Sequence, residues 1–326
     1  DKLVYKTDVD VPVPKPGEVL ISVKGAGINN TDINTRIGWY SKSVTSDTNQ
    51  GGAEGLEDAK KDDSSWSGNP LNFPLIQGAD VYGEITAVGS DVRPSRIGES
   101  VLVRTMQENP DASENSCWTL GSECNGGFAQ YIAVRSSEAF VINSDWSATE
   151  LASIPCAYST AEGLLHRSQV EKETVLITGA SGGVGSAAIQ LAKLRDATVI
   201  AQCAREKSEE VLQIGADKIV FRDSDLVAEI GSDAVDVVID LVGGSSWTQL
   251  LEIIKPGGRY ATSGAIAGPI VELDLRTLYL KDLTLYGCTF QPKEVFRNLI
   301  KYIEDNKIKP LVAKSYPLKE IKQAQL

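Results

Sequence analysis

The chain has 326 residues, of which 42% are hydrophobic and 23% are charged, values typical of a globular protein with a sizeable core. Its formal net charge of −12, together with the absence of any cluster of basic residues, argues against a nucleic-acid-binding surface. The sequence contains no apolar run of roughly 18 residues and no recognisable signal peptide, so we expect neither a membrane span nor export.

The five cysteines are scattered along the chain, and their number is odd. This usage favours reduced thiols in a reducing compartment, so we expect a cytoplasmic protein. We interpret Cys117 and Cys124 as ordinary thiols, with a reversible disulfide between them as the alternative.

The first 140 residues are dominated by short strand patterns and glycine corners. A Pro-rich turn precedes alternating apolar residues from Val19 to Val23, which predict a half-exposed strand. Residues 78–92 and 98–103 repeat this pattern, so we expect an antiparallel, barrel-like domain. Residues 41–72 are rich in Ser, Gly, Asp and Lys and form either a functional lid or a disordered segment, with a disordered or mobile segment preferred.

From about residue 148 helical and strand patterns alternate, which predicts a parallel sheet. Strands are predicted at 174–178, 197–202, 218–221, 235–240, 258–262 and 283–288, and helices at 184–195, 206–214, 224–230 and 245–254. An amphipathic helix at 292–304 and a strand near 311–316 are predicted to follow.

The second half of the chain is organised around residues 174–185, TVLITGASGGVG. An apolar strand, a glycine-rich turn and a helix follow one another there, which is the context in which such a motif indicates dinucleotide binding. Glycines let the backbone approach a pyrophosphate, and N–H groups at the helix start attract anions. The alternative is a tight strand–helix turn without a ligand. The predicted cofactor-binding residues of this loop are Ala180, Ser181, Gly182, Gly183, Val184 and Gly185.

Further ordered segments carry a family resemblance: N-x-x-D-x-x-x-R-x-G-x-Y at 29–40, GADVYGEITAVG at 78–89, GGFAQYIAV at 126–134, IPCAYSTA at 154–161, DVVIDLVGG at 236–244 and KPGGR at 255–259. With the glycine loop they resemble the medium-chain dehydrogenase/reductase superfamily, specifically its zinc-free quinone-oxidoreductase (zeta-crystallin-like) branch, over almost the whole chain. Compared with that family, the usual first and final strands are missing from this sequence.

The resemblance implies an α/β fold with a doubly wound parallel Rossmann sheet and an antiparallel barrel-like (GroES-like) catalytic domain. The catalytic domain would comprise residues 1–145 and 291–326, and the dinucleotide-binding domain residues 146–290, with the active site in the cleft between them. Strand 283–288 resembles the family's dimer seam, so we expect a homodimer.

The resemblance also assigns roles to single residues. Asn29 and Tyr40 are the catalytic candidates, able to bond the cofactor ribose or a substrate oxygen; the alternatives are a turn cap and a packed tyrosine. Asp32 is expected to hold the loop rather than to act as a base, and the lone histidine, His166, to be structural or exposed. The further cofactor-binding candidates are Thr160, Val242, Ser263 and Gly264.

No metal is expected. The ligand positions of zinc-dependent relatives fall on Asn29, Ala79 and Cys156, and one thiolate cannot hold a catalytic zinc that needs three protein ligands. Without zinc to polarise an oxygen, hydride transfer to an electron-poor C=C or to a quinone remains feasible, because hydrogen bonds alone can hold the developing enolate.

The expected cofactor is NADP(H). The acidic residue that contacts a ribose 2′-hydroxyl in NAD-preferring members would fall on Cys203, whereas Arg205 and Lys207 follow and could bind a 2′-phosphate. The alternative is that these two bases form the solvated start of a helix. We therefore expect an NADPH-dependent reductase of quinones, enones or similar small molecules. The other readings are a zinc-independent alcohol dehydrogenase and a non-catalytic dinucleotide-binding module.

Overall fold

The computed structural model describes residues 3–51, 55–109 and 118–326. The chain divides into two compact units. Unit 1 comprises Asp1–Val44, Gly51–Cys156 and Pro292–Leu326, and unit 2 comprises Thr45–Gln50 and Ala157–Gln291. The sequence-based division started the inserted domain at residue 146. In the structure helix α2 (Ala148–Ala152) still belongs to unit 1, because it packs so closely on strand β1 (Glu18–Gly25) that Gly25 has no room for a side chain.

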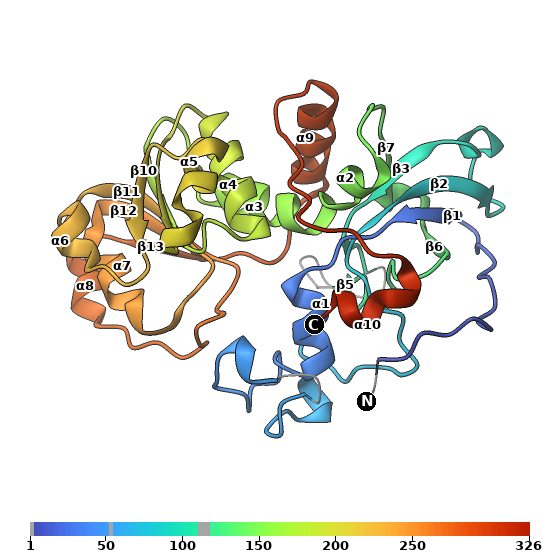
Figure 1. Ribbon diagram of the computed structural model, residues 1–326, viewed down its shortest axis with the longest axis horizontal. Coiled ribbons are helices and arrows are strands. Elements are labelled where there is room, and N and C mark those ends of the chain that lie inside the picture. Colours follow the sequence, from blue (N-terminus) through green and yellow to red (C-terminus); the bar gives the residue numbers. More distant parts are fainter. Residues whose placement is uncertain (1–2, 52–54, 110–117) are drawn as a thin grey trace. The chain divides into compact units, whose positions relative to one another are not determined.

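Unit 1 is built on a five-stranded antiparallel sheet with the order β6-β1-β2-β3-β7 (Figure 1). Strand β1 buries Val19 and Ile21 in a core to which the neighbouring strands contribute, while its alternate side chains are partly exposed. The remaining strands are β2 (Val81–Val88), β3 (Ser100–Val103), β4 (Met106–Gln107), β5 (Trp118–Thr119), β6 (Tyr131–Arg135) and β7 (Ala139–Val141), with β4 and β5 forming a separate pair.

The helices of unit 1 are α1 (Asn30–Ile37), α2, α9 (Lys293–Glu304) and α10 (Ile321–Ala324). Helix α9 confirms the predicted amphipathic helix, since it buries Val295, Leu299 and Ile303 on one face. The strand predicted near 311–316 is wrong: this segment is irregular, and the side chains of residues 311–315 are exposed. An alternating apolar pattern forms a strand only where a neighbouring strand accepts its backbone hydrogen bonds.

Residues 41–72 take a described path except at 52–54, with short 3₁₀ helices at Thr48–Gly51 and Lys61–Asp63. Residues Thr45–Gln50 belong to unit 2 and contact the loop that follows β12 (Ile254–Thr262), where the Thr48 N–H donates to the Ile266 carbonyl at 3.2 Å. The choice between a lid and a disordered segment stays a prediction.

Unit 2 contains a six-stranded parallel sheet with the order β10-β9-β8-β11-β12-β13. The strands are β8 (Thr174–Ile177), β9 (Thr198–Cys203), β10 (Lys218–Phe221), β11 (Val235–Asp240), β12 (Ile254–Thr262) and β13 (Thr284–Gly287). Counted from β8, this is the order 3-2-1-4-5-6 of a doubly wound dinucleotide-binding sheet, in which the direction of winding reverses between β8 and β11.

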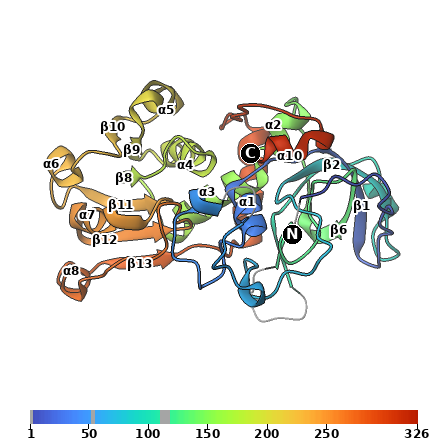
Figure 2. The ribbon, with the colours of Figure 1, turned by 60° about the horizontal axis from the view of Figure 1, so that its bottom comes forward.

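Helices cover both faces of this sheet. They are α3 (Pro155–Arg167), which begins in unit 1, α4 (Gly183–Lys193), α5 (Ser208–Ile214), α6 (Leu226–Ile230), α7 (Trp247–Ile253) and α8 (Leu275–Leu280). Helices α4 and α5 lie on one face, and α6 and α7 on the other (Figures 1 and 2). Trp247 and Leu250 of α7 pack with Leu176, Ile200 and Val238 on one face of the sheet. The residues directly before and after these three in their strands point to the opposite face.

The predicted fold class, a doubly wound parallel sheet with an antiparallel GroES-like domain, is confirmed. In the described part of the chain, no helix combines the length and apolar character needed to cross a bilayer.

Candidate functional site

The glycine-rich loop joins the carboxyl end of β8 to the start of α4. Gly179 has φ +57°, and a Cβ at Gly185 would lie 2.3 Å from the Gly179 carbonyl oxygen, so the turn requires glycine at 185. Gly183 is different: a Cβ there would meet its nearest atom at 3.5 Å, yet the residue is exposed. Protein packing therefore does not demand glycine at 183. An exposed backbone at a helix start fits the close approach of a pyrophosphate, so the loop fits a dinucleotide.

The other loop residues have different surroundings. Ser181 and Gly182 are exposed and Val184 is half-buried, so all three are accessible from solvent. Ala180 is fully buried, and its N–H donates to the Gln202 carbonyl at 3.1 Å. Ala180 can therefore shape the loop, but its N–H is already used within the protein.

The turn after β11 is held by a buried carboxylate. Asp240 accepts hydrogen bonds from the Thr178 hydroxyl at 2.6 Å and from the Tyr260 hydroxyl at 2.5 Å. It also accepts the N–H of Val242 at 2.9 Å and that of Gly243. The Val242 side chain lies near the glycine loop, 3.2 Å from the position of a Cβ on Gly179. Sequence reasoning missed Asp240 as a positioning residue, although a carboxylate within the apolar run DVVIDLVGG was a signal.

The remaining predicted cofactor residues of unit 2 surround the same strand ends. Ser263 and Gly264 follow β12 and are half-buried, and a Cβ at Gly264 would lie 2.9 Å from the Leu241 carbonyl oxygen. Thr160 is half-buried on α3, one turn after Ala157, whose methyl group would lie 3.5 Å from a Cβ on Gly183. The structure thus brings Val242, Gly264 and the helix that carries Thr160 close to the glycine loop or its neighbouring turn.

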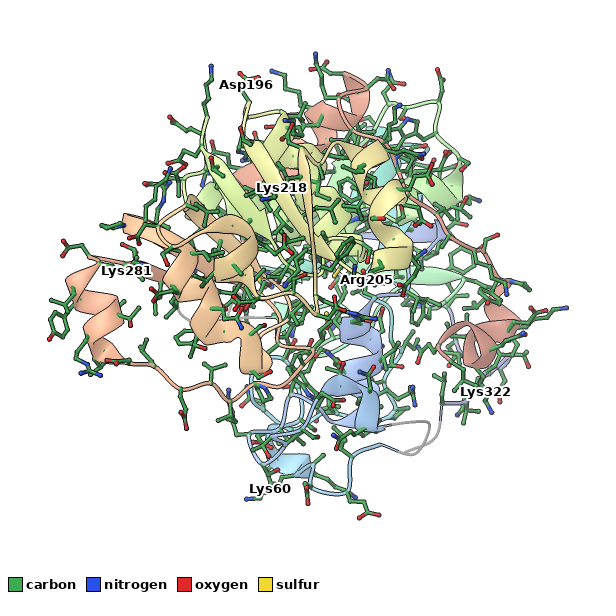
Figure 3. The ribbon with its side chains drawn as sticks, turned by 60° about the vertical axis from the view of Figure 1, so that its left-hand side comes forward. Lys60, Asp196, Arg205, Lys218, Lys281 and Lys322 are labelled. Carbon is green, nitrogen blue, oxygen red and sulfur yellow. The ribbon has the colours of Figure 1, made fainter. Side chains whose placement is uncertain are left out.

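Arg205 and Lys207 lie in a 3₁₀ turn directly after β9, and both bind carboxylates of the protein. Figure 3 shows Arg205 at the opposite end of the β-strands from Asp196 and Lys218. Lys207 Nζ lies 3.0 Å from Glu210 Oε2 on the next helical turn. Cys203 occupies the position at which NAD-preferring members would have an acidic residue. It is buried, and burial raises the pKa of its thiol. The two bases sit where a 2′-phosphate site is expected.

In unit 1 the predicted catalytic Asn29 is fixed by a buried carboxylate. The Asn29 side-chain amide donates to Asp80 Oδ2 at 2.8 Å, and the backbone N–H of Cys156 donates to Asp80 Oδ1 at 2.5 Å. Asn29 also precedes α1 as its N-cap residue, so the functional and the structural interpretation apply together. Asp80 joins three segments that are far apart in the sequence, and the sequence reasoning did not single it out.

Asp32 behaves as a loop-holding residue. Its carboxylate accepts the Asn29 N–H at 2.9 Å and the Ala79 N–H at 3.0 Å. Burial raises the pKa of Asp32 to about 7, and the nearby charge of Asp80 adds to the rise. Burial likewise raises the pKa of Asp80 to about 7. Two buried carboxyl groups therefore hold Asn29, with Asp32 accepting its backbone N–H and Asp80 its side-chain amide.

Tyr40 packs between aromatic rings while its hydroxyl stays hydrogen-bonded. The ring stacks on Trp66 with 6.0 Å between centroids and meets Trp39 edge-on at 5.7 Å. Its hydroxyl donates to Thr31 Oγ1 at 2.9 Å, and burial raises its pKa above the ordinary value of a tyrosine. The phenol is therefore neutral near pH 7 and serves as a hydrogen-bond donor.

These residues do not form a donor set for a catalytic zinc, which takes three protein ligands. Ala79 offers no ligand atom, so the positions of Asn29, Ala79 and Cys156 cannot supply three protein ligands. Within residues 3–51, 55–109 and 118–326, no three His, Cys, Asp or Glu side chains come together as a metal site.

Two further predictions concern His166 and the pair of Cys117 and Cys124. His166 is exposed in the last turn of α3. Cys117 lies outside the described residues, so the alternative of a disulfide with Cys124 stays a prediction.

Comparison with known proteins agrees with this arrangement. A family model described as the alcohol dehydrogenase GroES-like domain matches residues 15–144, and one described as zinc-binding dehydrogenase matches residues 183–305. The quinone oxidoreductase of Lama guanicoe is 27% identical over 99% of this chain and 88% of its own length. The acryloyl-coenzyme A reductase of Metallosphaera sedula is 27% identical over 96% of this chain and 89% of its own length.

Among solved structures, that of a provisionally named alcohol dehydrogenase from Sinorhizobium meliloti 1021 is 44% identical to this chain. It superimposes with a TM-score of 0.86 and covers 99% of this chain and 88% of its own. The chain therefore belongs to the medium-chain dehydrogenase/reductase superfamily, in its quinone-oxidoreductase-like branch, and is an oxidoreductase that works with a nicotinamide cofactor.

Proposed function

We propose that the chain is an NADPH-dependent reductase that transfers hydride, without zinc, to a quinone, an enone or a similar activated carbonyl compound or alkene. The observation that carries the proposal is the chemistry of unit 1, where the Asn29 amide keeps one N–H beyond the one that binds Asp80, and no metal donor set is present among the described residues. Tyr40 supplies a neutral phenol, whose proton would turn from Thr31 to the substrate oxygen. Neutral donors suit an enolate or hydroquinone oxygen, whose developing charge hydrogen bonds can stabilise.

The bound nicotinamide would supply the hydride, and unit 2 supplies the cradle for its pyrophosphate. Gly182 and Gly183 expose backbone at the start of α4, and Asp240 fixes the neighbouring turn. Arg205 and Lys207 would bind the 2′-phosphate, since a guanidinium forms paired charged hydrogen bonds with phosphate oxygens.

Two relatives support the substrate class. One is named for a quinone and the other for an acryloyl thioester, and both of these compounds contain an electron-poor conjugated carbonyl group. The shared chemistry is hydride addition to a conjugated system, which fits the proposed use of Asn29 and Tyr40.

Steady-state oxidation of NADPH in the presence of quinones and enones tests this proposal. We expect turnover with at least one conjugated acceptor, faster with NADPH than with NADH, and unchanged after dialysis against a chelator. Loss of activity on chelation that zinc restores would overturn the zinc-free mechanism.

Arg205→Ala tests the cofactor assignment. It should weaken NADPH binding by about 1–3 kcal/mol, as expected for a lost charged hydrogen bond, and leave NADH nearly unchanged. Arg276→Ala is a matched control, because Arg276 also forms an exposed ion pair, with Asp274 at the start of α8. Equal losses for both cofactors in Arg205→Ala would contradict the assignment.

A zinc-independent alcohol dehydrogenase is the second candidate, favoured by the 44% identity to the Sinorhizobium meliloti structure named as an alcohol dehydrogenase. NADP⁺-dependent oxidation of alcohols, with no reduction of quinones or enones, would favour it. A dinucleotide-binding module without turnover would bind NADPH and reduce none of these acceptors. The cytoplasmic location stays a prediction.

We also propose a homodimer through β13, the edge strand of the sheet, where Leu285 is partly exposed and α8 presents Leu275, Tyr279 and Leu280 to solvent. Light scattering at micromolar protein should give twice the chain mass, and Leu285→Lys should give monomers. A monomeric wild type would contradict the proposal.

A further inference from the structure

Asp223, which follows β10, lies against the guanidinium of Arg205. Strands β9 and β10 are parallel neighbours with Phe221 opposite Cys203, and the Arg222 N–H donates to the Cys203 carbonyl at 3.1 Å. The carboxyl ends of the two strands therefore lie together, and the turn after β10 reaches the 3₁₀ turn that begins at Arg205.

Two side chains position Arg205. Its guanidinium carbon lies 4.1 Å from the centroid of the Phe221 ring, a cation–π contact. Its Nη2 atom lies 3.3 and 3.4 Å from the two carboxylate oxygens of Asp223. These distances exceed those of a tight charged hydrogen bond, and both side chains are more than 60% exposed, at 63% and 64%. A phosphate can therefore compete with Asp223 for Arg205.

We propose that Asp223 is the acidic residue that sets how strongly the chain distinguishes NADP(H) from NAD(H). The carboxylate absent at Cys203 is supplied to the same end of the sheet by the neighbouring strand. It can accept a hydrogen bond from a ribose 2′-hydroxyl, and it repels a 2′-phosphate bound to Arg205. This inference rests on the proposed function, because it assumes that the adenosine ribose binds beside Arg205.

Because opposite charges lie at this edge of the sheet, the preference for NADP(H) over NAD(H) should not depend on the two bases alone. Arg205 attracts the 2′-phosphate, whereas Asp223 reduces that attraction and favours the hydroxyl. The chain should thus bind NADPH more tightly than NADH by a smaller margin than its two bases suggest.

Titration of NADPH and of NADH by calorimetry, at one fixed ionic strength, tests the inference in the wild type, Asp223→Asn and Arg205→Ala. Asp223→Asn should bind NADPH about five- to tenfold more tightly and NADH equally or less tightly. Glu252→Gln is the control for net charge, since it removes an exposed carboxylate on α7, and both Kd values should stay within about twofold of the wild type.

The variants separate the two proposals. If Arg205→Ala weakens NADPH binding but Asp223→Asn binds both cofactors as the wild type does, the role of Asp223 is overturned and the phosphate site stands. If Arg205→Ala leaves NADPH binding unchanged, the proposed phosphate site is wrong. The role of Asp223 then depends on the ratio of the two Kd values: a changed ratio in Asp223→Asn supports it, and an unchanged ratio overturns it.

Discussion

Tyr260 on β12 donates a 2.5 Å hydrogen bond to Asp240 on β11, in the interior of unit 2. The same carboxylate accepts backbone N–H groups of the turn that carries Val242, so this bond connects the sheet interior to a predicted cofactor contact. Burial of the phenol and the charge of Asp240 raise the pKa of Tyr260, which keeps the hydroxyl protonated and donating.

Tyr260→Phe should therefore weaken both stability and cofactor binding. Removing one donor from a buried carboxylate should lower the free energy of unfolding by about 1–3 kcal/mol. NADPH and NADH should be weakened equally, because β8 separates the turn after β11 from the turn after β9 that carries the proposed phosphate-binding bases. Urea unfolding and calorimetry measure the two effects. Tyr131→Phe, at an exposed tyrosine of β6 in unit 1, is the control and should change neither. A change in cofactor preference would contradict the explanation.

Two glycines of the nucleotide loop should respond differently to alanine. At Gly185 the added Cβ would lie 2.3 Å from the Gly179 carbonyl oxygen, so Gly185→Ala should lower the free energy of unfolding by about 1–3 kcal/mol. At Gly183 the nearest contact is 3.5 Å, so Gly183→Ala should leave stability within about 1 kcal/mol of the wild type.

Gly183→Ala should nevertheless weaken NADPH and NADH binding about tenfold or more, because the methyl group would occupy space that the pyrophosphate needs. Thermal unfolding and cofactor titration of the same protein samples measure both properties. Binding by Gly183→Ala as tight as that of the wild type would show that the exposed glycine backbone is not the phosphate cradle.

The paired carboxyl groups Asp32 and Asp80 predict a pH dependence of stability. In the unfolded chain each loses its proton near its ordinary pKa of 3.8, whereas in the folded chain it does so near 7. Between these values the folded state binds more protons, so the free energy of unfolding should fall as the pH rises from about 4 to about 7. The full cost is present above pH 7.

Asp80→Asn should reduce this slope, because it removes one of the two groups. Tryptophan fluorescence is a suitable probe, since four of the five tryptophans lie in unit 1. Asp217→Asn is the control: hydrogen bonds from Lys193 and the Val199 N–H outweigh its burial and lower its pKa, so it should leave the slope between about pH 5 and about pH 7 unchanged. Parallel stability curves for the wild type and Asp80→Asn would contradict the prediction.

A buried ion pair in unit 1 gives the largest expected stability change. Arg104 Nε lies 2.7 Å from Glu138 Oε2, and the two side chains are 1% and 0% exposed. Glu138→Gln would remove the buried carboxylate charge that Arg104 contacts and should cost about 3–5 kcal/mol of the free energy of unfolding. Glu210→Gln removes an exposed partner of Lys207 and should cost less than about 1 kcal/mol. Similar losses in both variants, measured by urea unfolding, would show that burial does not govern the effect.

The sequence predicted elements well where local pattern decides the structure. The glycine loop and its helix need only the residues from Thr174 to Lys193, and the alternation of strands and helices determines the class of sheet. The strand predicted near 311–316 was wrong because a strand depends on a neighbour that local pattern cannot reveal.

The candidate site follows the same division. Asn29 and Tyr40 stand in one motif and could be found from it. Asp80 is 51 residues from Asn29, and Asp223 is 18 residues from Arg205, so their hydrogen bonds exist only after folding. The local sequence identified the proposed binding groups, Asn29 and Arg205, whereas the carboxylates beside them, Asp80 and Asp223, adjoin other strands.

The assignment of Thr45–Gln50 to unit 2 limits how this protein can be recombined with its relatives. In a chimera that takes only residues 157–291 from this protein, the Ile266 carbonyl would lose its native partner, because the Thr48 N–H would come from the other parent. A chimera that also takes residues 45–50 from the same parent keeps both partners of that hydrogen bond from one protein. Unit 2 is therefore discontinuous in the sequence, and exchanging it with that of a relative requires the replacement of two segments rather than one.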